Sequence, residues 1–399
     1  MNRFTKRLTG ILALLCAAVM TAVGYFGETL PDSYYVSGDG CPELGGLFSM
    51  TPASADGAVA AASSETAAQE RGTVSLFGLI PIKDAEIKRT EAPLLIPGGS
   101  PIGIKLLTDG VIVVSTQKTA GGGNPAEKAG IKAGDCILEA NGEALSSSDR
   151  LAEIIMGSHG EKISLRIRRD GKIFETEVTP EFSEAEGTFK AGLWIKDSSA
   201  GVGTLTYIDP NTGGFGALGH PISDADTQKI LPLGSGEIVD VTITGCEMGS
   251  AGCPGELCGT FLSGLAAGNI SRNCEQGIFG TLNYVSRRAE ALPIAFKTEV
   301  KTGPATILTT VDGSTPKEYD AVIEKLSLSD AASTKNIIVR ITDPELLSLT
   351  GGIVQGMSGS PILQDGRIVG AVTHVFVSDP AMGYGIFIEN MLRAGGSLK

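Results

Sequence analysis

Short β-type runs separated by glycine are the strongest constraint on how this chain folds. Glycine supplies 54 of the 399 residues, roughly double its average share. Between the glycines lie segments in which apolar and polar residues alternate, as they do in half-buried strands. Four of these segments are AGLWIKD, GVGTLTYID, GIFGTLNYV and NIIVRITD. The pattern predicts a mainly β fold with many tight turns, and it excludes a helical bundle.

Length and charge narrow the class further. A chain of 399 residues is long enough for two folded domains and additional segments. Its 32 Lys and Arg residues against 45 Asp and Glu residues give a net charge of −13. Because the phosphate backbone would repel such a chain, we expect no nucleic-acid partner that is bound by charge.

An apolar run near the N-terminus predicts a membrane segment over residues 1–27. Residues 8–26 carry no charge, and their number is close to the ~20 that cross a bilayer as a helix. Three basic residues precede the run: Arg3, Lys6 and Arg7. Basic flanks stay in the cytoplasm, so the bulk of the chain is expected outside it. The sequence leaves open a cleaved signal peptide, but the length of the run favours a retained single-pass anchor.

Residues 28–92 are expected to form a flexible stalk with one strand-like segment. Ala, Ser, Gly and Thr dominate residues 41–72, which bury too little apolar surface to offset the entropy of ordering. Such a tether is a favoured place for proteolytic nicking. The strand-like segment is VSLFGLIPIKDAEI, residues 74–87.

Residues 93–180 resemble a PDZ domain. The resemblance rests on LLIPGGSPIGIKL, GVIVVS, NPAEKAGIKAGDCILEANGEAL and the hairpin ISLRIRRDGKIFETEVTP. It implies that a loop before the second strand presents backbone N–H groups to a peptide carboxylate, while the peptide adds a strand to the sheet. That loop would be Ile102, Gly103 and Ile104, and the partners would be C-terminal peptide tails. The alternative is a packed structural module that binds no free terminus.

The segment GMSGSP, residues 356–361, carries a candidate nucleophile. Its glycines allow a cramped turn in which the N–H groups of Gly356 and Ser358 point at one spot, as an oxyanion hole requires. A hairpin follows at once, with Asp365 and Gly366 at its turn. The loop and hairpin together resemble the nucleophile region of chymotrypsin-type serine peptidases. The resemblance implies a double β-barrel peptidase domain over residues 188–399, with Ser358 as the nucleophile.

A serine nucleophile needs a base, and the chain has three histidines. His159 lies in a polar turn of the PDZ-like region and is expected to be exposed. His374 lies in the strand after the hairpin, where it is either a satisfied strand residue or a wall of the specificity pocket. His220 lies in the glycine-flanked loop GALGHP and precedes the serine, the order found in this type of peptidase. We therefore predict His220 as the catalytic base.

Taken together, these blocks resemble the stage IV sporulation protein B (SpoIVB) family of serine peptidases. The resemblance covers most of residues 74–395 and is most specific in ITDPELLSLTGGIVQGMSGSPI. It implies a peptidase that cleaves itself near its N-terminal region and cuts a partner protein. That cut would let a membrane-embedded protease complex of the sporulation pathway release a late mother-cell sigma factor. The implied location is the space between the two forespore membranes.

The third member of the catalytic triad stays open at this stage. The family resemblance implies Asp343, which lies only fifteen residues before Ser358. The common topology of chymotrypsin-type enzymes would instead favour Asp240, which follows His220. Asp224 and Asp226 are expected only to shape the histidine loop.

No cofactor or metal is predicted. Four cysteines cluster in sequence at Cys246, Cys253, Cys258 and Cys274. Their spacings lack the Cys-x-x-Cys pairs of zinc ribbons, so disulfides or plain thiols are favoured over a metal site. Their pairing stays open.

Three other functions compete with this interpretation. The first is a non-catalytic adaptor whose PDZ groove tethers membrane partners. A housekeeping envelope protease of the HtrA kind is disfavoured because its PDZ domains usually follow the peptidase domain. A PDZ-bearing intramembrane zinc protease is excluded because no His-Glu-x-x-His motif occurs.

Overall fold

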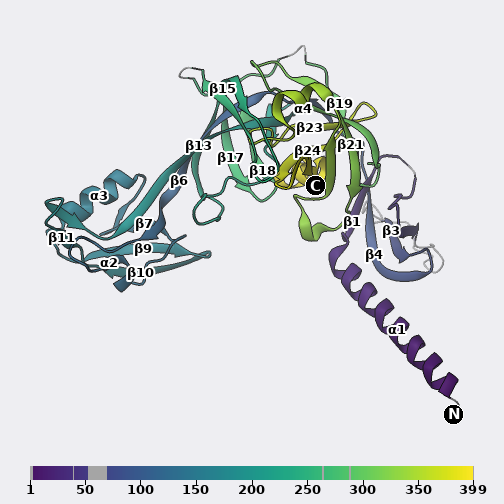
Figure 1. The fold of residues 1–399 in the computed structure, drawn as a ribbon, viewed down its shortest axis with the longest axis horizontal. Helices are drawn as coiled ribbons and strands as arrows, with labels where there is room; N and C mark the ends of the chain where they lie inside the picture. Colours follow the sequence, from purple (N-terminus) through teal and green to yellow (C-terminus); the bar gives the residue numbers. More distant parts are fainter. Residues whose placement is uncertain (1–2, 39, 53–69, 263–264, 287–288, 399) are drawn as a thin grey trace, which may run out of the picture.

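The structure is a computed structural model that describes residues 3–38, 40–52, 70–262, 265–286 and 289–398. It is mainly β, as the sequence predicts, with one long helix at the N-terminus. This helix, α1 (Arg3–Thr29), extends away from the rest of the molecule (Figure 1). Among the described residues it is the one helix long and apolar enough to cross a membrane, over Thr9–Thr29. It fits a single-pass anchor.

A small sheet follows the helix, where a flexible stalk was expected. Its strands pair in the order β1-β4-β3-β2. Their bounds are β1 (Ser33–Val36), β2 (Phe48–Pro52), β3 (Glu70–Leu76) and β4 (Ile80–Arg89). The side chain of Tyr34 is fully buried, and the ring of Tyr35 stacks on Phe296 of the peptidase region at 5.8 Å between centroids. The stalk prediction is therefore wrong for the described residues of 28–92, and residues 53–69 lie outside the described part.

The first of two barrels is a ring of six strands in which each pairs with the next. In ring order they are β6 (Pro101–Thr116), β15 (Leu233–Glu247), β17 (Gly268–Cys274), β18 (Gly277–Leu282), β14 (Gly214–Ala217) and β13 (Leu193–Ile208). The pairing of β13 with β6 closes the ring. Three short strands extend this sheet: β16 (Glu256–Phe261) beside β15, β5 (Leu94–Pro97) beside β13, and β19 (Leu292–Pro293) beside β5.

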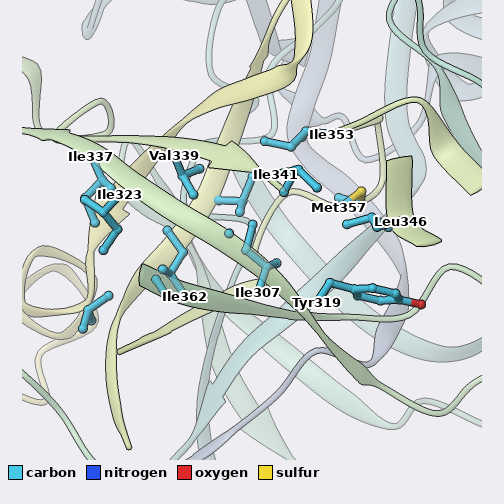
Figure 2. Packing of buried hydrophobic residues seen from close by; sticks show 14 of the residues in the cluster. Ile307, Tyr319, Ile323, Ile337, Val339, Ile341, Leu346, Ile353, Met357 and Ile362 are labelled. Atoms are coloured by element: carbon cyan, nitrogen blue, oxygen red, sulfur yellow. The ribbon is translucent and has the colours of Figure 1, made fainter. Parts of the chain in front are cut away.

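The second barrel is closed by another six strands. In ring order they are β20 (Gly303–Thr309), β21 (Lys317–Leu326), β22 (Ile337–Ile341), β25 (Asp379–Phe387), β24 (Arg367–Phe376) and β23 (Pro361–Gln364). Its core is made mainly of inward-facing aliphatic side chains from all these strands (Figure 2). Short helices join or follow the strands: η1 (Asp330–Ala332), α4 (Pro344–Thr350) and α5 (Ile388–Gly395). The predicted double-barrel peptidase fold is confirmed.

The PDZ domain lies beside the first barrel and shares two strands with it (Figure 1). The outer halves of β6 and β13 continue into its sheet. The other strands of this sheet are β7 (Cys136–Ala140), β8 (Glu143–Ala144), β9 (Ile163–Arg169) and β10 (Lys172–Val178), whereas β11 (Glu181–Ser183) and β12 (Thr188–Lys190) form a separate two-stranded sheet. The helices are α2 (Pro125–Lys128) and α3 (Ser148–Gly157).

The shared strands correct the expected PDZ boundaries of 93–180. Residues 93–108 pair with strands of the first barrel, so the PDZ sheet begins near Asp109. At its other end the PDZ sheet takes residues 193–196 of β13, which pair with residues 112–116 of β6. Each of the two strands β6 and β13 therefore runs from one domain into the other.

Candidate active site

A cleft of about 620 Å³ between the two barrels brings the predicted nucleophile and base together. The first barrel contributes residues 199–202 of β13 and the loop that holds His220. The second barrel contributes Gly356, Ser358 and residues 373–375 of β24. His220 and Ser358 are 138 positions apart in the sequence (358 − 220), yet both line the same cleft.

The loop that carries Ser358 is anchored in the second barrel. Met357 is fully buried in the barrel core, beside Leu346 and Ile353 (Figure 2). Gly356 has a φ of +94° and reverses the chain next to the buried methionine. This anchoring leaves Ser358 at the surface of the core, facing the cleft.

The first barrel clamps the same loop from the opposite side. The Thr204 N–H donates to the Ser358 carbonyl at 3.0 Å, and its hydroxyl donates to the Gly356 carbonyl at 2.7 Å. The Thr206 hydroxyl donates to the Gly359 carbonyl at 2.8 Å. Gly359 has a φ of +99°, and a Cβ there would lie 2.1 Å from the Thr204 carbonyl oxygen. The second glycine of the motif therefore allows the two barrels to meet at the nucleophile.

Two backbone N–H groups of the loop stay available. Within the described residues, neither the N–H of Gly356 nor that of Ser358 donates to another group, whereas those of Met357, Gly359 and Ser360 all donate to carbonyls. Unpaired adjacent N–H groups at a cleft are what stabilisation of an oxyanion requires.

The hydroxyl of Ser358 is turned toward the second barrel. Its Oγ donates to the Thr373 carbonyl oxygen at 2.8 Å. A rotation about the side-chain bond would release it toward the cleft. No residue pattern predicts this carbonyl partner, because a backbone acceptor has no residue-type signature.

His220 lies directly after β14, in a turn with left-handed backbone at Leu218 and Gly219. Its Nδ1 lies 2.9 Å from the carbonyl oxygen of Pro221. This bond places a hydrogen on Nδ1, which leaves Nε2 as the proton acceptor. Burial lowers the pKa of the imidazole, and the Pro221 carbonyl offsets that effect in part. The ring is therefore neutral near pH 7 and able to accept a proton.

The second imidazole of the cleft belongs to His374. Its ring centroid lies 5.0 Å from that of His220, with the two rings tilted by 42°. Although His374 is open to the cleft, desolvation by the surrounding protein, and then the charge that His220 would carry when protonated and that of Lys335, lower the pKa of His374 to about 4. It lines the cleft, which agrees with the pocket-wall alternative. His159 is exposed in the PDZ domain, as expected.

Neither candidate for the triad acid reaches this cleft. Asp343 is the N-cap of α4, where it accepts from the N–H groups of Glu345, Leu346 and Asp320. The N–H group of Leu346 is the main cause that lowers the pKa of this carboxyl. Asp240 is exposed on β15, opposite Ile102. Neither residue lines the cleft. The contacts of Asp343 support a structural role as a helix cap, in place of the acid role that the resemblance implied.

The loop acids have the shaping role that was expected. Asp224 is almost fully buried and accepts from the N–H groups of Asp226 and Thr227 and from the Thr227 hydroxyl. Lys196 of β13 pairs with Asp226 at 2.7 Å and with Asp224 at 3.4 Å. Burial raises the pKa of Asp224, but the hydrogen bonds from Thr227 and the ion pair with Lys196 outweigh it and hold the pKa below its ordinary value.

The predicted PDZ carboxylate loop is corrected by the structure. Ile102, Gly103 and Ile104 lie inside β6 and pair with β13 on one side and β15 on the other. Both edges of the strand are occupied there, so no peptide strand can be added. Both isoleucines are buried in the first-barrel core, and the ring of Phe261 occupies the space where a Cβ of Gly103 would lie.

The four clustered cysteines are all free thiols in this structure. Cys253 and Cys258 are exposed, and Cys246 and Cys274 are half-buried. Among the residues that the structure describes, no group of three His, Cys, Asp or Glu side chains is arranged to hold a metal ion.

Comparison with known proteins supports the identity of both domains. The family model described as SpoIVB peptidase S55 matches residues 187–392, just over half of the chain, and a PDZ model matches residues 120–169. The chain is 33% identical over 98 residues to the putative zinc metalloprotease LL2128 of Lactococcus lactis, covering 25% of this chain and 21% of that protein. It is 44% identical over 59 residues to a probable periplasmic serine endoprotease DegP-like of Marinomonas sp., covering 14% of this chain and 13% of that protein.

A solved structure with similarity is that of Rv3671c from M. tuberculosis, in an inactive serine variant. The identity is 13% and the TM-score 0.28, with 49% of this chain and 82% of that chain covered. The chain thus spans only a small part of the curated relatives named above, whereas the peptidase model matches it from the turn between β11 and β12 to α5. The barrels, the serine loop and this match agree, and the chain belongs to the SpoIVB peptidase S55 family of serine peptidases.

Proposed function

We propose that Ser358 and His220 hydrolyse peptide bonds in the cleft between the barrels, outside the cytoplasm and tethered by α1. The observation that carries this proposal is that one cleft holds the hydroxyl, the imidazole and two unpaired backbone N–H groups. The hydroxyl and the two N–H groups come from the serine loop of the second barrel and the imidazole comes from the first barrel, so only the contact between the barrels brings them together.

The reaction is an acyl transfer. The Ser358 hydroxyl turns from the Thr373 carbonyl, gives its proton to Nε2 of His220 and attacks the substrate carbonyl carbon. The N–H groups of Gly356 and Ser358 stabilise the resulting oxyanion, and loss of one such donor costs about 3 kcal/mol of transition-state stabilisation. His220 then protonates the leaving amine, and the C–N bond breaks. Water, deprotonated by the same imidazole, releases the acyl group from the serine.

A backbone carbonyl takes the orienting role usually given to an aspartate. The Pro221 carbonyl accepts from Nδ1 of His220 and fixes the tautomer with Nε2 free. The neighbouring ring of His374 packs on the same imidazole. The proposal therefore needs no carboxylate in contact with His220.

The family supplies the biological role that we propose. The peptidase cleaves itself near the N-terminal region and cuts a partner protein in a sporulation signalling pathway. That cut leads to intramembrane proteolytic activation of a late mother-cell sigma factor, and the site is the space between the forespore membranes. What supports this is membership of the SpoIVB peptidase S55 family together with the apolar N-terminal helix.

The PDZ domain would hold peptide tails of the substrate or of the membrane-embedded protease complex. Since β6 is paired on both sides at residues 102–104, the available edge is that of β13 beside α3. A peptide that adds a strand there gains main-chain hydrogen bonds.

The test is reaction with a fluorophosphonate probe. Wild type and His374→Gln should be labelled on Ser358, whereas Ser358→Ala should not be labelled and His220→Ala should be labelled far more slowly. In parallel, the intact mass of purified full-length protein should show trimming near the N-terminal region in wild type and a full-length Ser358→Ala variant. A wild type that the probe never labels would leave only the non-catalytic adaptor.

A further inference from the structure

The strand β13 has a free edge that runs from the active-site cleft to the PDZ domain. One side of residues 193–204 pairs with β6. In the described part of the chain, no strand pairs with the other side until Leu205 meets β14. Residues 199–202 of this free edge line the cleft. The outer end reaches the PDZ domain, where α3 lies (Figure 1).

The backbone groups of this edge point outward at both ends. The Thr204 N–H donates to Ser358 rather than to β6, so Thr204 faces the free side. Backbone groups alternate along a strand, and those of Val202 and Ala200 therefore face the free side as well. At the outer end the Gly192 carbonyl accepts from the Gln117 N–H next to β6, so Leu193 faces the free side.

The outer end of the edge lies beside helix α3 of the PDZ domain. The Ser148 N–H, at the start of α3, donates to the Asp197 carboxylate at 2.6 Å. Beyond the end of α3, a Cβ at Gly160 would lie 2.9 Å from the ring of Phe189 in β12. These contacts hold the helix alongside residues 193–197 with its N-terminus nearer the cleft.

Ion pairs hold the PDZ domain and the cleft in one arrangement. Lys196, midway along the edge, pairs with Asp224 and Asp226 of the histidine loop. Lys229 of the same loop pairs with Asp170, at the turn between β9 and β10, at 2.8 Å. The strand and the loop thus connect the two regions twice, so the edge keeps a fixed path between them.

The chemistry decides which half of a substrate lies on this edge. His220 must protonate the leaving amine, and the first barrel carries His220. The substrate residues that follow the scissile bond, the prime side, therefore leave the cleft along the first barrel, where residues 199–202 of β13 offer their free edge. An antiparallel strand on that edge runs toward lower residue numbers of β13, which is toward α3 of the PDZ domain.

We propose that the free edge of β13, residues 193–202, binds the prime side of a polypeptide substrate as one added antiparallel strand that lies in the cleft and continues beside α3 of the PDZ domain. The inference rests on the proposed peptidase activity and adds a substrate requirement to it. From Val202 to Leu193 the chain makes nine steps of about 3.3 Å, a span of roughly 30 Å. An extended prime side of about ten residues covers this length. Good substrates are therefore unstructured segments with that much chain after the cut.

The test measures cleavage against prime-side length with the full-length protein in detergent micelles. A peptide library prepared from a digested proteome first supplies a sequence that the enzyme cuts. Synthetic peptides then keep that sequence and vary the prime side from about two to about fourteen residues. We expect kcat/KM to rise by about tenfold or more up to roughly ten residues and then to stay level, since each added pair of backbone hydrogen bonds strengthens binding.

A matched pair of variants tests the edge itself. Ala200→Pro removes an N–H that faces the substrate but takes no part in the pairing with β6, whereas Ala200→Val adds a side chain and keeps the N–H. Ala200→Pro should abolish most of the gain from long prime sides, and Ala200→Val should keep it.

The outcomes separate the two proposals. If the probe labels Ser358 but kcat/KM is the same for short and long prime sides, the shared edge is refuted and the peptidase stands. If Ala200→Pro and Ala200→Val retain equal length dependence, the shared edge is likewise refuted. If the probe does not label Ser358, both proposals fail.

Discussion

Replacement of Gly359 by alanine tests how closely the two barrels meet at the nucleophile. A left-handed backbone costs an ordinary side chain about 1–2 kcal/mol. In addition, the new Cβ would lie 2.1 Å from the Thr204 carbonyl oxygen and 2.6 Å from the Leu218 nitrogen. The serine loop must then move away from β13. This weakens three hydrogen bonds from Thr204 and Thr206, each with a net value of about 1 kcal/mol.

Gly366→Ala is the matched control for this change. Gly366 also has a positive φ, +72°, but no atom lies within 4 Å of a Cβ there. It should therefore cost only the backbone strain, about 1–2 kcal/mol, against about 4–5 kcal/mol for Gly359→Ala. The difference of about 3 kcal/mol corresponds to a melting temperature lower by roughly 6–12 °C for a domain of this size.

The assay is thermal unfolding followed by circular dichroism, with the rate of fluorophosphonate labelling as a second readout. Because the displaced loop also carries Ser358, labelling of Gly359→Ala should slow by about a hundredfold, whereas Gly366→Ala should react at the wild-type rate. Equal melting temperatures and equal labelling rates for the two variants would refute the argument that the glycine is required for contact between the barrels.

Three further predictions follow from single residues. Because burial holds the pKa of His220 below its ordinary 6.5, the base stays deprotonated into mildly acidic solution. As the pH is lowered, kcat/KM should therefore begin to fall only below pH 6.5, and a fall centred at or above pH 6.5 would contradict this. The same depressed pKa means that the unfolded chain takes up the proton first, so this contribution to stability is present above pH 6.5 and is lost as pH falls. Asp343→Asn should retain labelling of Ser358 because asparagine also caps helices, whereas Asp343→Ala should lower the free energy of unfolding by about 1 kcal/mol. Loss of labelling in the asparagine variant would restore the acid role of Asp343. The Tyr34 hydroxyl is buried with no hydrogen-bond partner among the described residues, so Tyr34→Phe should not lower the melting temperature. Tyr34→Ala should destabilise the fold by about 3–5 kcal/mol. A markedly lower melting temperature of the phenylalanine variant would show that the hydroxyl has a partner.

The sequence predicted the parts of this molecule that depend on local pattern. Alternating runs gave the β class, and the GMSGSP loop followed by a hairpin located Ser358 in a double-barrel peptidase. The glycine-flanked loop gave His220, which the structure brings to the same cleft. In each case neighbouring residues determine the local shape, so the pattern and the structure agree.

Features that depend on distant contacts were not predictable in this way. The partners of Ser358 and His220 are backbone carbonyls of Thr373 and Pro221, and carbonyls have no residue-type signature. The stalk composition suggested a tether, yet the pairing of four strands and the stacking of Tyr35 on Phe296 of the peptidase region order its described part as a sheet. The sequence alone does not show that α4 begins directly after Asp343, which is what makes this carboxylate a helix cap in the structure.

The sharing of β6 and β13 by two domains has a practical consequence for anyone who wishes to separate them. Excision of residues 109–197 would remove the outer half of both strands and leave two cut ends, at Thr108 and Ser198, that the barrel pairing holds close together. A short turn that joins those ends should give a peptidase without its PDZ domain. Truncation at a single point between the two domains would instead remove a strand from the first barrel. In this protein the PDZ domain is continuous with the first barrel through two adjacent strands. The two domains can therefore be separated only by cutting both β6 and β13.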